Sequence, residues 1–175
     1  MNRKQKLSTI LLAVAMGLSG LANAQPYNRY MTFQGAMADV DGYSSGIAGV
    51  ATYGVRVPEL HKNFAVEAEY AMTFFEPDGK GAGGEEFEVS YYHLGAYGVY
   101  AHPLSTNFHV RGRLGILYQR VEVNSPSSSA SDDDFELSYG FGFTAGMGQG
   151  KRVILEYTVI DSEINHISAG IQFKL

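Results

Sequence analysis

Hydrophobic and polar positions alternate along most of the chain, and the longest regular stretch is FAVEAEYAMTFF, from Phe64 to Phe75. Every second residue from Phe64 to Phe74 falls on one face, and Glu67 and Glu69 fall on the other. A period of two predicts a β-strand, because successive side chains point to opposite sides. Twelve residues exceed the roughly five or six of a typical strand. They suit a tilted strand that crosses a bilayer, which needs about nine to eleven.

The same alternation predicts seven further strands, at 29–38, 47–57, 86–101, 107–123, 135–147, 152–160 and 166–175. Within 86–101 the later half is ambiguous in phase, and a β-bulge there would exchange its faces. The Gly-rich stretch 76–85 and the low-complexity stretch 124–134 predict loops. Polar, mostly longer connections alternate with short ones, as they do when hairpins open at opposite ends of a barrel. We therefore expect an all-β, eight-stranded antiparallel up-and-down barrel.

The composition of the two faces predicts which one points outward. One face is aromatic and aliphatic through most strands, and the other is small or charged. An eight-stranded barrel has an interior just wide enough for side chains, so the small and charged set fits inside. Aromatic residues also gather near strand ends, as in membrane-interface girdles; they are Phe64, Phe108, Phe173, Phe74, Phe87, Tyr118 and Phe135. We predict a transmembrane barrel with its apolar face toward lipid. A soluble periplasmic barrel that carries a ligand, with the faces reversed, is the alternative.

Residues 1–24 have the pattern of a cleaved secretory signal peptide. Arg3, Lys4 and Lys6 precede a mostly apolar segment, and Ala22-Asn23-Ala24 matches a cleavage site. Cleavage would leave a barrel domain at 25–175 with 10 basic (13 − 3) and 18 acidic side chains, a net charge of −8. Such a surplus of acid disfavours nucleic acid as a partner. The chain has no cysteine, so it has neither disulfides nor thiol chemistry.

Three segments carry a resemblance to a known family: NFAVEAEY at 63–70, NFHVRGRLGILYQ at 107–119 and HISAGIQFKL at 166–175. From Tyr27 to Leu175 the chain resembles the small eight-stranded bacterial outer-membrane β-barrel proteins, the group of the outer-membrane protein A membrane domain and the opacity-type, porin-like proteins. The resemblance implies a place in the outer membrane of a Gram-negative cell. It also implies contact with membrane lipid and lipopolysaccharide, and insertion by the outer-membrane assembly machinery.

Six charged residues fall on the inward face of four predicted strands: Arg56, Glu67, Glu69, Arg111, Arg113 and Glu156. An unpaired charge in a narrow interior is costly, so we expect these groups to form ion pairs across the lumen. Such a set would either plug the barrel or, if the pairs rearranged, form a gated ion path.

A catalytic alternative rests on His166 and Ser168, which share a strand face near Glu156. Ser, His and an acid are the groups of acyl transfer, and outer-membrane lipid A deacylases of similar barrel size use them. In that family Asn follows the His-x-Ser, whereas Ala169 follows here. We predict that both side chains point inward, whereas attack on a lipid would need them to point outward. We therefore expect no enzymatic activity and no cofactor.

Acidic residues concentrate in the predicted longer loops: Asp39, Asp41, Glu76, Asp78, Glu85, Glu86, Asp132, Asp133, Asp134, Asp161 and Glu163. Carboxylates bind divalent cations, but no calcium-loop spacing is present, and we expect no metal site. The stretch Gly79 to Gly84 lacks the Lys-Ser/Thr of a phosphate-binding loop. The loops would be solvated or would contact a surface ligand. The expected role is structural, surface contact or a weak pore.

Overall fold

The computed structural model describes residues 28–41, 44–75, 78–80, 86–124 and 129–175. The expected signal peptide at 1–24 lies outside these residues. The strands are β1 (Arg29–Val40), β2 (Gly46–Arg56), β3 (Phe64–Phe75), β4 (Asp78–Lys80), β5 (Glu86–Pro103), β6 (Phe108–Asn124), β7 (Ser129–Gly148), β8 (Lys151–Val159) and β9 (Ile164–Lys174). Within the described ranges no helix is long and apolar enough to span a membrane.

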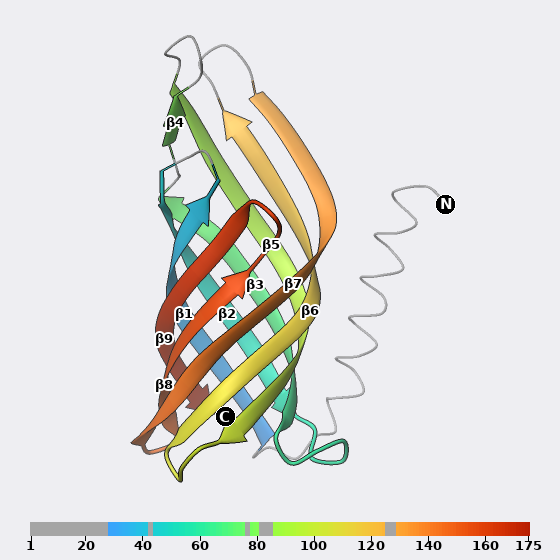
Figure 1. Ribbon diagram of the computed structural model, residues 1–175, viewed down its shortest axis with the longest axis vertical. Helices are drawn as coiled ribbons and strands as arrows, with labels where there is room; N and C mark the ends of the chain where they lie inside the picture. Colours follow the sequence, from blue (N-terminus) through green and yellow to red (C-terminus); the bar gives the residue numbers. More distant parts are fainter. Residues whose placement is uncertain (1–27, 42–43, 76–77, 81–85, 125–128) are drawn as a thin grey trace, which may run out of the picture.

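Eight of these strands form a closed antiparallel barrel (Figure 1). Each pairs with its neighbour in the chain, β1 pairs with β9, and β3 pairs with β5. The short strand β4 pairs only with β5 and stands outside the ring. The prediction of an eight-stranded up-and-down barrel is therefore confirmed, since closure leaves no open edge around the ring.

The two ends of the barrel differ, and we name them by their connections. At the turn end, β1 begins, β9 ends, and short turns join β2 to β3, β5 to β6 and β7 to β8 (Figure 1). The tightest turn, at 148–150, has positive φ at Gly148 (82°), Gln149 (53°) and Gly150 (72°). Glycine adopts this backbone region without steric cost, so two glycines fit this turn. The opposite end is the loop end.

Apolar side chains cover the outside of the barrel, as predicted. Large exposed hydrophobic residues come from most barrel strands, and examples are Phe33, Met37, Leu114, Ile116, Leu137, Phe141, Leu155 and Ile171. Small and polar side chains alternate with them and point inward. A soluble barrel has the opposite arrangement, so the apolar band indicates a lipid-facing surface.

The lumen also holds three tyrosines, whereas the sequence predicted mainly small and charged residues there. Tyr30, Tyr91 and Tyr97 are buried inside, at 7%, 2% and 1% exposure. Glycines provide the space, because a Cβ atom at Gly95 or Gly115 would lie 2.6 Å from the Tyr97 ring. The bulge considered for the later half of 86–101 does not occur. β5 keeps an unbroken register with both β3 and β6.

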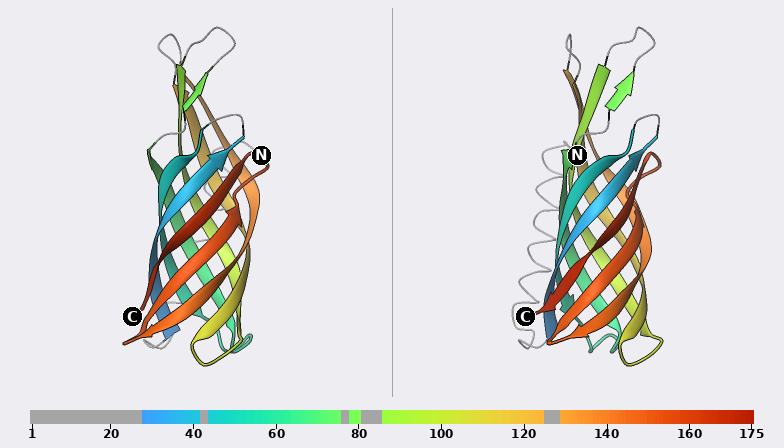
Figure 2. Two further views of the ribbon diagram at one scale, coloured as in Figure 1. Left: turned by 60° about the vertical axis from the view of Figure 1, so that its left-hand side comes forward. Right: turned by 90° about the vertical axis from the view of Figure 1, so that its left-hand side faces the viewer.

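Three strands extend far beyond the others at the loop end (Figure 2). β5, β6 and β7 have 18, 17 and 20 residues, whereas the other barrel strands have 9 to 12. β7 pairs with β8 only from Tyr139 onward, and β5 pairs with β3 only as far as Tyr92. The part beyond the buried interior residues Tyr91, Gln119 and Ser138, which we name the projecting sheet, consists of residues 86–90, 120–124 and 129–136.

The projecting sheet corrects two loop predictions. Residues 78–80 form β4, and 129–134 belong to β7. The composition of these segments favours loops, but β5 and β6 provide a continuous row of backbone partners. Backbone hydrogen bonds to the neighbouring strand outweigh the loop preference of these residues, because strand propensity depends strongly on context.

Candidate functional site

The lumen is filled in successive layers, which we describe from the turn end to the loop end. An open mouth leads to a layer of paired charges, then to a layer of two histidines and a tyrosine, and then to an apolar plug. Each layer is built by inward-facing residues from several strands, because alternate residues of every strand reach the interior. The chemistry of the lumen therefore changes with height along the barrel.

The charged layer consists of Glu67, Glu69, Arg111, Arg113 and Glu156, all at most 5% exposed. Arg111 Nη2 lies 2.7 Å from Glu67 Oε2. Its Nε lies 2.8 Å from Glu156 Oε2, an ion-pair distance without the alignment of a hydrogen bond. The layer thus joins strands β3, β6 and β8 across the lumen.

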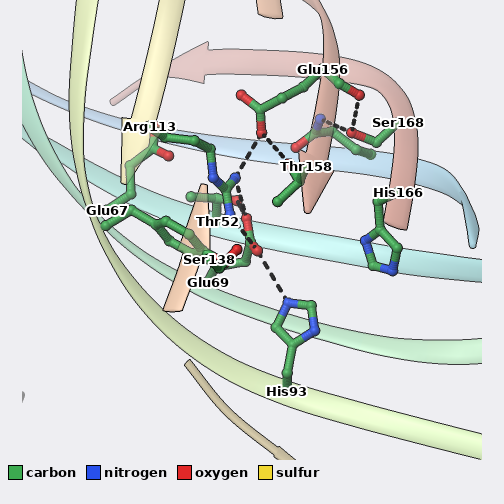
Figure 3. A network of polar contacts seen from close by, with 12 residues as sticks. Thr52, Glu67, Glu69, His93, Arg113, Ser138, Glu156, Thr158, His166 and Ser168 are labelled. Atoms are coloured by element: carbon green, nitrogen blue, oxygen red, sulfur yellow. Dashed lines mark hydrogen bonds and ion pairs between the residues drawn. The ribbon is translucent and has the colours of Figure 1, made fainter. Parts of the chain in front are cut away.

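Arg113 occupies the centre of the charged layer (Figure 3). It donates to both Glu69 oxygens and to Glu156 Oε1, each at 2.7 Å. Its guanidinium carbon lies 3.6 Å from the centroid of the Tyr97 ring, a cation–π contact. Two carboxylates and one aromatic face therefore compensate for the loss of water around this buried cation.

Hydroxyl and imidazole groups complete the carboxylates of the charged layer. Tyr30 donates to Glu67 at 2.6 Å, and Thr52 donates to Glu69 at 3.3 Å. His93 Nε2 lies 3.1 Å from Glu69 Oε1 (Figure 3). These contacts use oxygen lone pairs that the arginines leave free, which lowers the cost of burying the carboxylates.

Two glycines of β7 make room for this layer. A Cβ atom at Gly142 would lie 2.4 Å from the Leu155 carbonyl oxygen and 3.0 Å from Glu156 Cα. A Cβ atom at Gly140 would lie 2.7 Å from the Tyr157 carbonyl oxygen. The Gly-rich inward face of β7 therefore determines where the ion pairs fit.

Arg56 is not part of the charged layer, which corrects the prediction that all six charges meet. It has the inward phase but stands at the last position of β2, where its side chain is exposed. It lines a cavity of about 60 Å³ at the mouth of the turn end. The other lining residues are Tyr30, Lys62, Asn63, Phe64, Ala65, Val99, Ala101, His109, Arg111, Thr144, Arg152 and Gln172.

The histidine layer does not have the geometry of an acyl-transfer site. His166 and Ser168 are buried in the lumen, as predicted from their phase. His166 Nε2 is hydrogen-bonded to the Tyr91 hydroxyl, and Ser168 Oγ accepts from Gln34 Nε2 at 2.8 Å. Within the described residues no hydrogen bond joins His166 to Ser168, and Glu156 pairs with the arginines instead. The Ser, His and acid side chains therefore serve separate contacts (Figure 3).

An apolar plug closes the lumen above the histidines. It consists of Ala36, Ala38, Val40, Ala48, Val50, Ala71, Tyr91, Leu117, Ile160 and Ile164, with Val121 packed against it. Such a cluster excludes water, because apolar surface is favourably removed from it. The described lumen therefore contains two different packed layers, one ionic and one apolar.

The acidic residues of the loop end separate into turn-forming and surface groups. Asp161 accepts backbone hydrogen bonds from Glu163 and Ile164 and so stabilises the β8–β9 turn. Glu76 and Glu85 lie outside the described residues. Among those that are described, no group of three or more His, Cys, Asp or Glu residues could hold a metal ion.

Acidic surface groups concentrate on the β7 edge of the projecting sheet. Asp132, Asp133 and Asp134 follow one another there, and Glu136 comes two residues later. Burial first, and then the charges of Asp161 and Asp134, raise the pKa of the Glu136 carboxyl. Charges along an unpaired strand edge also oppose pairing with other chains.

Several lumen residues were missed by the sequence reasoning. Tyr30, His93 and Tyr97 contact the charged layer directly. Every second residue from Tyr91 to Val99 in β5 is buried, but the sequence left the phase of this half of the strand open and so did not place His93 and Tyr97. Arg152 lies on the same face of β8 as Glu156, so the alternation along that strand also predicts that Arg152 points inward.

Comparison with known proteins agrees with this architecture. A family model described as outer membrane protein beta-barrel domain matches residues 8–173. No curated protein sequence matches the chain significantly.

Among solved structures, Neisserial surface protein A (NspA) superposes with a TM-score of 0.64 at 14% identity, covering 86% of this chain and 98% of that one. Ail, the attachment invasion locus protein of Yersinia pestis, gives 0.53 at 16%, covering 83% and 97%. The N-terminal barrel domain of Pseudomonas aeruginosa OprF gives 0.55 at 10%, covering 85% and 98%. At these identities the similarity establishes the fold alone.

Proposed function

The chain belongs to the outer membrane protein beta-barrel domain family and is located in the bacterial outer membrane, and from this premise we propose that it is a closed, non-enzymatic anchor for a surface-contact sheet. Outer-membrane barrels turn their short connections to the periplasm and their longer ones outward. The projecting sheet then stands outside the cell, and the mouth opens toward the periplasm.

The observation that carries this proposal is the unequal length of the strands. Residues 129–136, eight residues of β7, continue past the last pairing with β8 and past the buried Ser138. At roughly 3.3 Å per residue they extend the strand by about 26 Å. A barrel needs no such extension to cross the membrane, since β8 crosses with 9 residues. The extra length places a surface of β5, β6 and β7, with the short strand β4 paired along the β5 edge, beyond the lipid.

The chemistry of the projecting sheet favours a cationic partner. The β7 part of the sheet carries four acidic side chains: Asp132, Asp133, Asp134 and Glu136. The one described basic side chain of the sheet, Arg120, is already paired with Glu122 at 2.9 Å. Ail has also been solved with the heparin analogue sucrose octasulfate. An acidic sheet repels such a sulfated sugar, so we expect a different class of partner here.

The ion-path alternative is less well supported than the plug. Ions would have to pass both the charged layer and the apolar plug. In the charged layer the terminal nitrogens of Arg113 already donate three hydrogen bonds at 2.7 Å to Glu69 and Glu156. We expect no unit conductance in planar bilayers. Stepwise currents from the purified wild-type protein would contradict a closed barrel.

A hairpin-trimmed variant tests the surface-contact role. Gln119 and Asp134 are paired, so residues 120–133 can be replaced by a two-residue Asn-Gly turn. We expect the variant to insert and to keep a heat-dependent shift in an unboiled detergent gel, because the ring is intact. Binding of the protein in nanodiscs to a polylysine-coated surface should be lost.

Charge variants separate electrostatic contact from shape. Asp132→Asn, Asp133→Asn and Asp134→Asn together should weaken polylysine binding about as strongly as trimming does. The matched control neutralises three acids of the other loop-end connections, Asp39→Asn, Asp41→Asn and Glu163→Gln, and should retain most of the binding. Equal losses in both triple variants would indicate general surface charge and would overturn the assignment to the projecting sheet.

A further inference from the structure

The mouth at the turn end has a chemical composition that neither the barrel fold nor the surface-contact role explains. Residues 25–175 contain ten Lys and Arg side chains, and four of them line this one cavity: Arg56, Lys62, Arg111 and Arg152. The cavity lining, which falls entirely within the described residues, includes neither Asp nor Glu. In a chain with a surplus of acid, this is a concentrated positive site.

Only one of the four cations is neutralised within the described structure. Arg111 is paired with Glu67 and Glu156 deeper in the lumen. No described carboxylate lies within ion-pair distance of Arg56, Lys62 or Arg152. Like charges placed together without a counter-ion raise the energy of the mouth, and an anion bound among them would relieve it.

A second observation points to a ligand at the same place. Thr144 lines the cavity and is 4% exposed, yet its hydroxyl has no hydrogen-bond partner in the described structure. Buried hydroxyl groups normally have a partner, and an unpaired one costs free energy. The hydroxyl can donate a hydrogen bond to an anion that occupies the cavity.

His109 adds a donor of defined tautomer. Arg152 Nη1 donates to His109 Nδ1 at 3.4 Å, which requires that the proton of the neutral ring be on Nε2. His109 and Thr144 are also directly paired across β6 and β7. Arginine, imidazole and hydroxyl donors from three adjacent strands therefore meet at one cavity.

We propose that the mouth binds a phosphate oxyanion from the periplasmic side, held by Arg56, Lys62 and Arg152 and by the Thr144 hydroxyl. Phosphate offers several acceptor oxygens, which suits arginine and hydroxyl donors from different directions. A cavity of about 60 Å³ is far below the roughly 300 Å³ at which drug-sized ligand sites begin. It accommodates the charged group alone. That group comes either from free phosphate or from the headgroup of a phospholipid in the inner leaflet.

The test uses the full barrel in maltoside micelles, which carry no phosphate, and follows backbone amide resonances during titration with inorganic phosphate at constant ionic strength. We expect saturable shifts at His109, Thr144 and Arg152. The double variant Arg56→Gln/Arg152→Gln should bind at least about tenfold more weakly, because each removed contact to a charged group has a large effect. Arg120→Gln, at the other end of the barrel, is the matched control and should bind like the wild type.

A more conservative variant separates a loss of binding from a loss of folding. Thr144→Val removes only the unpartnered hydroxyl and should weaken binding by roughly threefold to tenfold, while the heat-dependent gel shift confirms the folded barrel. A parallel titration with dihexanoyl-phosphatidylglycerol below its micelle concentration distinguishes the sources. Binding of phosphate supports a free anion as ligand, and binding of the lipid alone supports a headgroup. Binding of neither, or binding by the double variant as tight as that of the wild type, would overturn the site.

Discussion

Two pairs of arginines in one lumen show how height along a barrel decides what a charge does. Arg111 and Arg113 lie in the charged layer, buried between carboxylates at 2.7 to 2.8 Å. Arg56 and Arg152 have the same inward phase but stand at the mouth, where no described carboxylate pairs with them. The first pair is bound into the structure, and the second is available to a ligand. Strand phase is identical for the two pairs, so only their positions along the strands separate these roles.

The largest effect should come from breaking the charged layer. Arg113→Met would leave Glu69 and Glu156 short of a buried partner, and an uncompensated buried charge costs about 3–5 kcal/mol. Urea unfolding of the barrel in lipid vesicles measures this loss. The matched control is Arg152→Gln, which removes an unpaired cation from the mouth. Equal destabilisation by the two variants would contradict the distinction between the buried charged layer and the mouth.

The space for the charged layer provides the next test. Gly142→Ala would place a methyl group 2.4 Å from the Leu155 carbonyl oxygen, so the backbone of β8 must shift. Overpacking of this kind costs about 1–3 kcal/mol, seen as a lower urea midpoint. Gly112→Ala is the matched control, because a Cβ atom there meets no other group within 4 Å. A stable Gly142→Ala barrel would show that the layer tolerates displacement.

The mouth should respond to charge removal in the opposite direction. Arg56→Gln/Arg152→Gln removes two unpaired like charges, and we expect stability in phosphate-free buffer to stay the same or rise by about 0.5 kcal/mol. Urea unfolding with and without added phosphate measures it. The wild-type barrel should gain stability from phosphate, and the double variant should gain much less at the same phosphate concentration, because its native state binds the anion more weakly. A double variant that loses stability without phosphate would indicate a structural role for the mouth arginines.

The smallest effect concerns exposed charge on the projecting sheet. Burial, followed by the charges of Asp161 and Asp134, raises the pKa of Glu136, so this carboxylate takes up a proton at higher pH than an ordinary Glu. Polylysine binding should therefore weaken as the pH falls from 7 toward 5. The Glu136→Gln variant should bind polylysine slightly more weakly than the wild type at pH 7. Its binding should begin to weaken only at a lower pH than that of the wild type. An unchanged pH profile in Glu136→Gln would assign the decline to other carboxylates.

The sequence by itself determined the architecture and the contents of the lumen in outline. A period of two over long stretches predicts strands, and an apolar face opposite a small and charged face predicts a barrel whose outside meets lipid. Five of the six residues expected to meet in the lumen do so: Glu67, Glu69, Arg111, Arg113 and Glu156. Phase follows from the chain alone, because alternation is a local property of an extended backbone.

Only the tertiary structure decided height, partners and strand length. The register between strands placed Arg56 at the mouth rather than among the carboxylates, and it brought Arg152, His109 and Thr144 to the same cavity. It also gave the acidic stretch 132–134 a partner strand in β6, which turned an expected loop into part of the projecting sheet. Cross-strand register depends on residues far apart in the chain, which a local pattern does not contain.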